Sequence, residues 1–320
     1  AGLVLLFPLP GCAQDRPVAG EPGAAADPVE ALQTGDYEAA AQGFRMLARN
    51  GNGLPGTGRG WARALAATGD YDGALEALGD SEAAGASAAA LADVRGELLV
   101  ALGLNDEAEE AFRSSDEPLA RLGLAELLWN TGRRSEAEPI FDSFIDYYNS
   151  SANLTWEELA AVGRALTYLG ADNPDLFHDA VRAYEEAIEA DPGDPTPKVR
   201  LAELFLDKFD SRNAGGLLDE AITRNPRHAR GLFAKAKRAR FDGSSESFEF
   251  VREALEVNPR FTEARAFLSN LHLEIGQTSQ AEEEAREALD TNPVSLPAWT
   301  AIAAAAHLGG EHVAFEQAVD

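Results

Sequence analysis

The chain has 320 residues, of which 45% are hydrophobic and 25% charged, a composition that supports a buried core and excludes the disordered class. Its formal net charge is −27, from 54 acidic and 27 basic side chains. Such a molecule repels phosphate backbones and anionic lipid surfaces, so nucleic acid is not an expected partner. Because Cys12 is the one cysteine, the chain forms no internal disulfide and no cysteine-based zinc site.

The first residues are an apolar run from Leu3 to Leu9, followed by Pro10, Gly11 and Cys12. This run is far shorter than the ~20 apolar residues of a transmembrane helix. Its end resembles the lipobox of a bacterial lipoprotein signal, in which the chain is cleaved before the cysteine and the cysteine receives a lipid. Pro10 departs from the usual pattern. The resemblance implies that residues 1–12 are a truncated signal peptide and that Cys12 is lipidated; the alternative is an ordinary signal segment with a cysteine nearby by chance.

Residues 13–26 are polar, rich in proline and glycine, and without periodicity, which predicts a flexible linker. If Cys12 carries a lipid, this linker joins it to a folded body at 27–320. The expected location is then the bacterial cell envelope, on the periplasmic or other extracytoplasmic side.

A repeat begins directly after the linker. Glycines recur at an equal spacing of 34, at Gly35, Gly69 and Gly103, and an alanine stands five positions after each. Those alanines are Ala40, Ala74 and Ala108, and the pairs Gly132 with Ala137 and Gly276 with Ala281 have the same offset. Glycine permits a tight reversal between two helices, and a small alanine lets the second helix cross the first closely.

The second half carries a different marker with the same period. An Asp-Pro or Asn-Pro pair occurs four times, with its proline at positions 192, 226, 259 and 293, so that the successive spacings are 34, 33 and 34. Proline cannot continue a helix, so each pair is expected to separate one helical hairpin from the next.

Together these markers resemble the tetratricopeptide repeat (TPR), whose unit of about 34 residues is a helix-turn-helix. The resemblance implies an all-α protein, a right-handed α-solenoid of about eight to nine units; the alternative is an irregular helical bundle. The predicted helices are 28–34 and 37–49, 57–68 and 71–79, 87–102 and 105–114, 118–131 and 134–148, 155–169 and 175–190, 196–208 and 211–224, 228–241 and 245–257, and 262–275 and 278–291. A ninth unit starts near Leu296 and is interrupted at Asp320, so we expect the natural protein to continue.

The chain departs from the TPR pattern at several places. Phe209 stands where a turn glycine is expected, and the segment from Gly170 to Pro174 lengthens another turn. Arg265 and Gly58 occupy positions that the family usually fills with a large apolar residue.

The sequence contains no recognisable catalytic or metal-binding motif. None of the five histidines lies in a His-Glu-x-x-His motif, and His272 is predicted to be a packed, hydrogen-bonded side chain. Residues 51–58 lack the Gly-Lys-Ser/Thr of a phosphate-binding loop and are interpreted as a loop between helices. Adjacent carboxylates such as Glu109 and Glu110 point apart on a helix and are interpreted as solvated. We therefore expect no enzyme activity, no cofactor, no metal and no catalytic residue.

The resemblance also implies a concave groove, lined by the first helix of each unit, that binds an extended or helical peptide. On that pattern the candidate groove residues are Arg164, Thr167, Glu203, Leu206, Lys237, Arg240, Asn270 and Leu273. A basic strip from Arg224 to Arg240 has seven positive and no negative side chains. It either docks an acidic partner segment or neutralises acidic neighbours, among which Glu203, Glu220, Glu249 and Glu253 are the nearest candidates.

These observations predict a non-catalytic protein-protein interaction scaffold that is membrane-bound only through its lipid. An alternative is that the repeats are the recognition arm of a larger envelope enzyme, for example a zinc metallopeptidase whose catalytic domain lies beyond residue 320. A His-Glu-x-x-His helix downstream favours the enzyme, and an early stop codon favours the scaffold.

Overall fold

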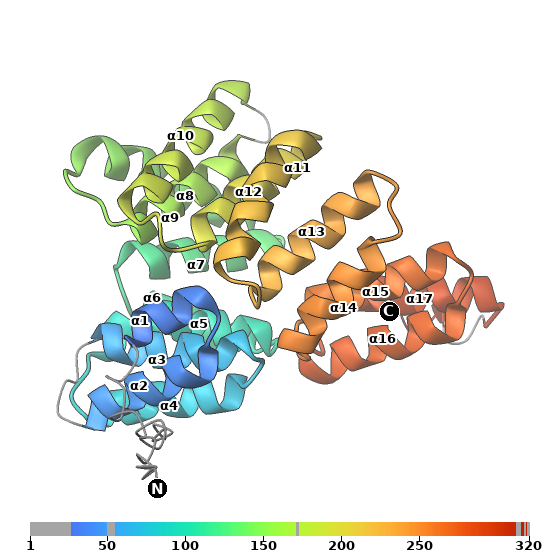
Figure 1. Cartoon of the computed structure of the whole chain (residues 1–320), viewed down its shortest axis with the longest axis horizontal. Helices are drawn as coiled ribbons and strands as arrows, with labels where there is room; N and C mark the ends of the chain where they lie inside the picture. The colour runs from blue at the N-terminus through green and yellow to red at the C-terminus, as the bar shows by residue number, and fades with distance from the viewer. Residues whose placement is uncertain (1–26, 50–54, 171–172, 312–314, 317, 319–320) are drawn as a thin grey trace, which may run out of the picture.

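A computed structural model of the chain describes residues 27–49, 55–170, 173–311, 315–316 and 318. These residues form helices and turns without any strand, and the helices follow one another in antiparallel pairs (Figure 1). The fold is an all-α solenoid, as the period of the sequence markers predicts. In each pair we call the first helix A and the second helix B.

The first four units are α1 (Pro28–Thr34) with α2 (Tyr37–Arg49), α3 (Pro55–Ala67) with α4 (Tyr71–Ala83), α5 (Ala92–Ala101) with α6 (Asn105–Arg113), and α7 (Pro118–Asn130) with α8 (Arg134–Ser150). The next four are α9 (Trp156–Leu169) with α10 (Pro174–Ala190), α11 (Thr196–Asp207) with α12 (Ser211–Arg224), α13 (Ala229–Phe241) with α14 (Ser247–Val257), and α15 (Thr262–Glu274) with α16 (Thr278–Thr291). A final helix, α17 (Leu296–Gly309), occupies the helix A position of a ninth unit.

Small and aromatic side chains fill the space between the two helices of a unit. The alanines at the predicted offset, Ala40, Ala74, Ala108, Ala137 and Ala281, are fully buried, as are the aromatic rings of Phe112 and Phe141. Helix A of one unit also contacts helix A of the next along most of the chain. The A helices therefore line the inner face of the solenoid, and the B helices lie outside.

Local sequence explains where individual helices begin and turn. Thr155 and Glu158 form a capping box at the start of α9, in which each side chain bonds the other's backbone N–H. Phe209 occupies the turn-glycine position with a left-handed φ of 62°, and its side chain is 77% exposed because the turn projects from the surface. The chain therefore turns at the position that the repeat predicts, although the residue there is not glycine.

Two predictions about local structure are wrong. Residues 55 and 56, interpreted as part of a loop, belong to helix α3, which begins two residues before the predicted helix 57–68; Gly58 lets α3 pack directly on Ser81 of α4. The predicted helix 87–102 is divided into the 3-10 helix η1 (Ala88–Leu91) and α5. The rest of the loop, residues 51–54, lies outside the described residues.

The solenoid curves until its A–B turns in units 1 to 3 touch the B–A turns that precede α13, α15 and α17 (Figure 1). Each contact joins residues from opposite halves of the chain, and we call the three contacts rungs 1, 2 and 3. In each rung a turn glycine, Gly35, Gly69 or Gly103, lies against the asparagine of an Asn-Pro pair.

Rungs 1 and 2 share one set of interactions. In rung 1 the amide of Asn225 donates to the hydroxyl of Tyr37 at 3.2 Å, and that hydroxyl donates to the carbonyl of Arg227 at 3.0 Å. The Arg227 guanidinium lies 5.3 Å from the centre of the Tyr37 ring and pairs with Glu38 at 2.6 Å. Each side chain therefore has a partner across the contact, and the polar groups buried there are satisfied.

Rung 2 repeats these interactions one unit later. Asn258 donates to the Tyr71 hydroxyl at 3.1 Å, and Arg260 lies 5.1 Å from the Tyr71 ring centre and pairs with Asp72 at 2.8 Å. Rung 3 is simpler, because Asn292 donates to the carbonyl of Val100 at 3.1 Å and no tyrosine or arginine is present at the equivalent positions.

Residues 1–26, including Cys12 and the lipobox-like segment, lie outside the described residues, so lipidation stays a prediction. Among the helices that the structure does describe, none is long and apolar enough to cross a membrane.

Candidate functional site: a polar cavity on the inner face

A cavity of about 260 Å³ lies on the inner face of the solenoid. Its walls come from both arms of the curve, since Gln33 and Tyr37 of unit 1 lie opposite Asn225 and His228 at the start of unit 7. The floor comes from A helices α3, α5, α7, α9 and α11. Because Tyr37 and Asn225 also form rung 1, the cavity is closed on that side by the rung itself.

One end of the cavity is acidic. Asp93 pairs with Arg59 and lies 3.8 Å from Arg63, and Glu157 of α9 pairs with Arg63 of α3 across the inner face. Burial raises the pKa of Asp93, with Arg59 opposing. Glu157 is half-buried, and although desolvation acts to raise its pKa, the charge of Arg63 keeps that pKa below the usual range. Both carboxylates are thus held by arginines on a neighbouring wall.

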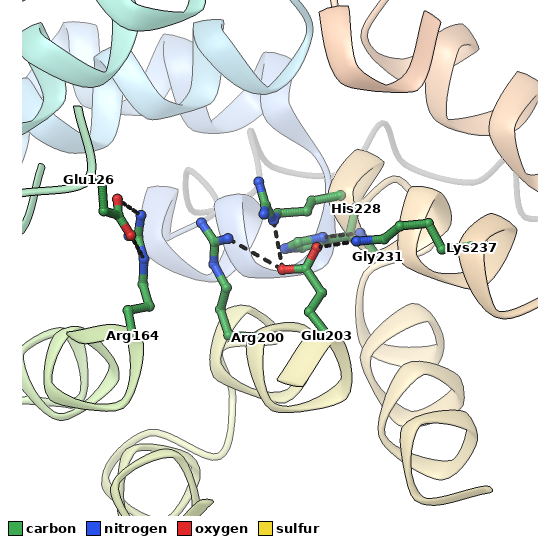
Figure 2. Close-up of polar contacts among 8 residues, drawn as sticks. Glu126, Arg164, Arg200, Glu203, His228, Gly231 and Lys237 are labelled. Carbon is green, nitrogen blue, oxygen red and sulfur yellow. Dashed lines mark hydrogen bonds and ion pairs between the residues drawn. The ribbon is translucent and has the colours of Figure 1, made fainter. Parts of the chain in front are cut away.

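At the other end, arginine and lysine side chains gather around two buried or half-buried carboxylates. Arg164 of α9 is held by Glu126 of α7, with its Nε 3.0 Å from Oε1 of the carboxylate. Glu203 of α11 accepts from three cations, Arg200 at 3.3 Å, Arg230 at 2.9 Å and Lys237 at 3.1 Å (Figure 2). Burial alone would raise the pKa of Glu203, but these charges lower it strongly. Two further carboxylates face this cluster, because the charge of Lys237 acts on Asp207 and that of Glu263 acts on Arg230.

Among the predicted groove residues, the structure brings three into this network. Arg164, Glu203 and Lys237 project from A helices into the polar contacts just described (Figure 2). Arg240 lies on the same side of α13 and pairs with Glu274 of α15, with its Nε at 2.8 Å.

The remaining four predicted residues are placed elsewhere. Thr167 donates to the carbonyl of Gly163 in its own helix at 2.8 Å, and Leu206 packs against the core between α11 and α12. Asn270 and Leu273 are half-buried on α15 and do not line the cavity. Whether the eight residues bind a partner stays a prediction.

The basic strip from Arg224 to Arg240 is paired with acidic side chains throughout. Its partners within the neighbouring units include Glu203, which the sequence singles out, whereas Glu220 pairs with Lys198 instead. Arg224 and Arg227, at the start of the strip, bind Glu30 and Glu38 of unit 1, which are 194 and 189 residues away. In this structure each basic side chain of the strip therefore has an acidic partner within the chain, and Arg224 and Arg227 join the two arms.

Other interpretations of single residues can be checked directly. His272 is buried, its Nδ1 lies 2.7 Å from Oε1 of Gln277, and its ring packs edge-on against Phe248; the prediction of a packed, hydrogen-bonded side chain is confirmed. Glu109, one of the adjacent carboxylates, pairs with Arg113 and Arg133. Within the described ranges no three His, Cys, Asp or Glu side chains are grouped to hold a metal.

Sequence reasoning misses Arg63, Arg200 and His228 as inner-face residues. A signal for Arg200 exists, because Arg200 and Glu203 stand three apart on one predicted helix and so share a face. Nothing in the sequence connects Arg63 to Glu157, which is 94 residues away, because that contact depends on the curvature of the whole solenoid.

No protein-family model and no curated protein matches this sequence. Several solved structures match in shape. Human IFIT1, in a dimer with m7Gppp-AAAA, has a TM-score of 0.53 at 16% identity, over 90% of this chain and 71% of that one. The APC/C hetero-tetramer Cut9-Hcn1 has a TM-score of 0.51 at 12% identity, over 90% of this chain and 54% of that one.

TTC0263, a thermophilic TPR protein of Thermus thermophilus, has a TM-score of 0.47 at 19% identity, over 62% of this chain and 100% of that one. At these identities the likeness concerns the fold alone. The helix pairs, the turn positions and the period of the sequence, together with the likeness to the first two structures, define the chain as a TPR-like α-solenoid.

Proposed function

We propose that this protein is a non-catalytic interaction scaffold that binds a peptide or protein segment on its inner face. The observation that carries the proposal is the cavity, which is lined by charged side chains of the A helices and bounded by both arms of the solenoid. A buried polar surface of this kind offers directional partners to a ligand, whereas the side chains of a purely structural core are apolar. Nucleic acid is not the proposed ligand, because the chain carries a net charge of −27.

The two faces of α13 allow a matched test. Lys237 and Arg240 contact the A helices α11 and α15, whereas Lys235 and Arg238 contact α12, a B helix. The helical periodicity predicts this division. Substitutions on the two faces change the net charge equally but alter different surfaces.

A photo-crosslinking amino acid at Arg240 on the inner face, compared with one at Arg252 on helix B of the same unit, tests where partners bind. Both side chains belong to exposed residues. The proposal predicts a covalent partner band from position 240 and none from position 252. Equal labelling at the two positions would place the partner outside the inner face.

Charge reversal then tests the contribution of the basic residues. Reversing Lys237 and Arg240 to Glu should weaken binding of that partner by a few kcal/mol at most, mainly by slowing association and with strong salt dependence. Reversing Lys235 and Arg238 should leave binding nearly intact. Equal losses would mean that overall charge governs association.

We further propose that lipidated Cys12 tethers this scaffold to a bacterial envelope membrane. When the protein is expressed with a full signal, Cys12→Ser should then release it to the soluble fraction, because the described helices offer no membrane span. Retention of the variant on membranes at the wild-type level would rule out this anchor. The alternative of a recognition arm in a larger envelope enzyme keeps the same inner-face binding and places chemistry beyond residue 320.

A further inference from the structure

Three consecutive A–B turns, which join α11 to α12, α13 to α14 and α15 to α16 (Figure 1), each expose a large apolar side chain. Phe209 is 77% exposed, Phe241 50% and Ile275 57%. The centres of the two rings lie 5.9 Å apart. Arg240, beside Phe241, donates to Glu274, beside Ile275, at 2.8 Å, so the three turns adjoin one another. We call these three side chains the apolar edge.

Phe209 holds its place in the turn under strain. Its φ of 62° is left-handed, whereas the corresponding turns of the next two units have glycine with positive φ, at Gly243 and Gly276. An L-residue enters this region with a steric strain that glycine avoids. Burial against the described residues does not offset that strain, because most of the ring is exposed. Strained residues cluster at functional positions, so a ring that is both strained and exposed points to a contact outside this chain.

A hydrogen bond between the turns of units 6 and 7 holds the apolar edge in place. The hydroxyl of Ser211, two residues after Phe209, donates to the carboxylate of Asp242, beside Phe241, at 2.8 Å. The two rings therefore form a preformed surface. A partner that covers such a surface loses little free energy to ordering it.

The rungs show that an A–B turn can serve as an interface, but the apolar edge is not a rung. At rung 2 a Cβ on Gly69 would lie 2.6 Å from Oδ1 of Asn258, so the asparagine contact requires glycine. Phe209 stands at the same position of its turn, where its side chain blocks the approach of an Asn-Pro turn. A further solenoid arm, from this chain or from a second copy, therefore does not dock at Phe209 as it docks in the rungs.

The size of the apolar edge suits a single helix better than a dimer interface. A phenylalanine side chain has about 150 to 250 Å² to bury, so at their exposed fractions the two rings offer roughly 200 to 300 Å². A standard interface takes about 800 Å² from each partner. Side chains at i and i+3 or i+4 of a helix have Cβ atoms about 5 to 6 Å apart, which matches the ring separation of 5.9 Å.

The charges around the apolar edge determine the polar face of that helix. The turn segments 207–212, 240–246 and 274–278 hold five carboxylates and three basic side chains. The carboxylates are Asp207, Asp210, Asp242, Glu246 and Glu274, and the basic side chains are Lys208, Arg212 and Arg240. The first segment is balanced, so the excess of two negative charges lies at units 7 and 8. On a chain with a net charge of −27, this excess attracts a basic helix and repels an acidic one.

We propose that the apolar edge docks a basic amphipathic helix of a partner protein. The apolar stripe of the helix covers Phe209 and Phe241, and its cationic side chains lie near the carboxylates of units 7 and 8. This surface is separate from the inner face, so the inference goes beyond the proposed function and does not depend on it.

Three labelled peptides of equal length test the proposal by fluorescence anisotropy with the full chain. The first has leucines at i, i+3 and i+4 spacing and lysines on the opposite face. The second keeps the leucines and has glutamates in place of the lysines, and the third has the composition of the first in an order without an apolar face. The first peptide should bind saturably and at least about tenfold more tightly than either of the others, because it alone matches both the apolar edge and its charge.

Phe209→Gly separates binding from stability. The variant loses the exposed ring and the strained φ together, so its Tm should be no lower than that of the wild-type protein. The first peptide should nevertheless bind at least about tenfold more weakly to it, and Phe241→Ala should have a similar effect. Met46→Ala removes a 44% exposed side chain from α2 and should leave binding within about twofold of the wild-type value.

The other outcomes overturn the proposal. They are equal binding of the first and third peptides, no binding of the first peptide, and wild-type binding by Phe209→Gly. Self-association of the chain that Phe209→Gly abolishes, measured by sedimentation, would assign the edge to a second copy instead. Flotation of the chain with phosphatidylcholine vesicles that Phe209→Gly abolishes would assign the edge to a membrane surface instead.

Discussion

Rungs 2 and 3 hold the same two arms together with different chemistry. Rung 2 joins Tyr71 and Asp72 to Asn258 and Arg260 through a hydrogen bond, a ring-guanidinium contact and an ion pair. In rung 3 the tyrosine position is Asn105 and the arginine position is Val294, and the contact reduces to the Asn292 amide on a carbonyl and Val294 packed near Gly103.

Both sides of the contact change together between these rungs. Where the arginine becomes valine, the tyrosine that it covers is also replaced, although the two positions lie in opposite halves of the chain. Paired changes of this kind are what a specific contact produces, because an unpartnered buried tyrosine hydroxyl or arginine is costly. The comparison therefore indicates that closure of the solenoid is built into the repeats, with rungs 1 and 2 more specific than rung 3.

The largest expected effect comes from closing the space at a rung glycine. Gly69 has a φ of +84°, and a Cβ there would lie 2.6 Å from Oδ1 of Asn258, whereas Gly276, with a φ of +77°, has open space around it. Gly276→Ala should lower the free energy of unfolding by about 1 to 2 kcal/mol because of backbone strain. Gly69→Ala should lower it by about 1 to 3 kcal/mol more, because the new Cβ also collides with Asn258. Urea denaturation followed by circular dichroism measures both. Equal losses would mean that the arms do not touch at rung 2.

The next largest difference between rung 2 and rung 3 is expected when the asparagine of each rung is removed. Asn258→Ala leaves the buried Tyr71 hydroxyl without its donor, which should cost on the order of 1 to 3 kcal/mol, whereas Asn292→Ala exposes a backbone carbonyl and should cost about 1 kcal/mol. Hydrogen exchange at the amides of residues 65–72 and 99–105 reports each rung locally. A larger loss of protection from Asn292→Ala than from Asn258→Ala would reverse the order proposed here.

Alkaline pH should weaken rungs 1 and 2 and leave rung 3 unaffected. Burial raises the pKa of Tyr37 and Tyr71, partly opposed by the asparagine hydrogen bonds. Because the folded pKa lies above the unfolded value of about 10, the contribution of each tyrosine is present below about pH 10 and is lost as the pH rises through the folded pKa. The Tm advantage of the wild-type protein over Tyr37→Phe/Tyr71→Phe should therefore shrink above about pH 10. A constant difference would exclude these hydroxyls as titrating groups.

The smallest effect is expected from the exposed ion pair of rung 2. The Asp72 side chain is 74% exposed, so Asp72→Asn should cost less than about 1 kcal/mol, and less still at high salt. The change in Tm at low and high ionic strength checks this. A salt-independent loss well above the range of exposed ion pairs would show that the pair contributes more than surface electrostatics.

Much of the fold follows from local signals in the sequence. The regular spacing of turn glycines and Asx-Pro pairs predicts the helix pairs, because a glycine or proline acts on its own few neighbours. It also predicts the turn at Phe209 and the burial of Ala40 and its equivalents. The prediction fails at residues 55 and 56 because the four glycines between residues 51 and 58 are typical of a loop, although small residues also permit close helix packing.

The cavity and the rungs depend on curvature, which arises from small rotations summed over several units. Gly-Asp-Tyr at 35–37 and 69–71 and Asn-Pro-Arg at 225–227 and 258–260 are visible in the sequence as repeated motifs. Taken singly, each indicates a local turn. The two separations along the chain are nearly equal, but they show which motifs meet only once the number of units between the arms is known. For the same reason the sequence places Arg164, Glu203 and Lys237 on the correct helices but does not predict their common cavity.

Crosslinking in register tests the closure of the solenoid most directly. In a Cys12→Ser background, one variant carries cysteines at both Glu38 and Arg227, and a second variant carries cysteines at both Asp72 and Arg260. A short bismaleimide is then added to each. The swapped pairs, Glu38 with Arg260 and Asp72 with Arg227, are the controls. Closure through the rungs predicts rapid crosslinking of both in-register pairs and little of the swapped pairs. Equal yields from all four pairs, or none from any, would contradict it.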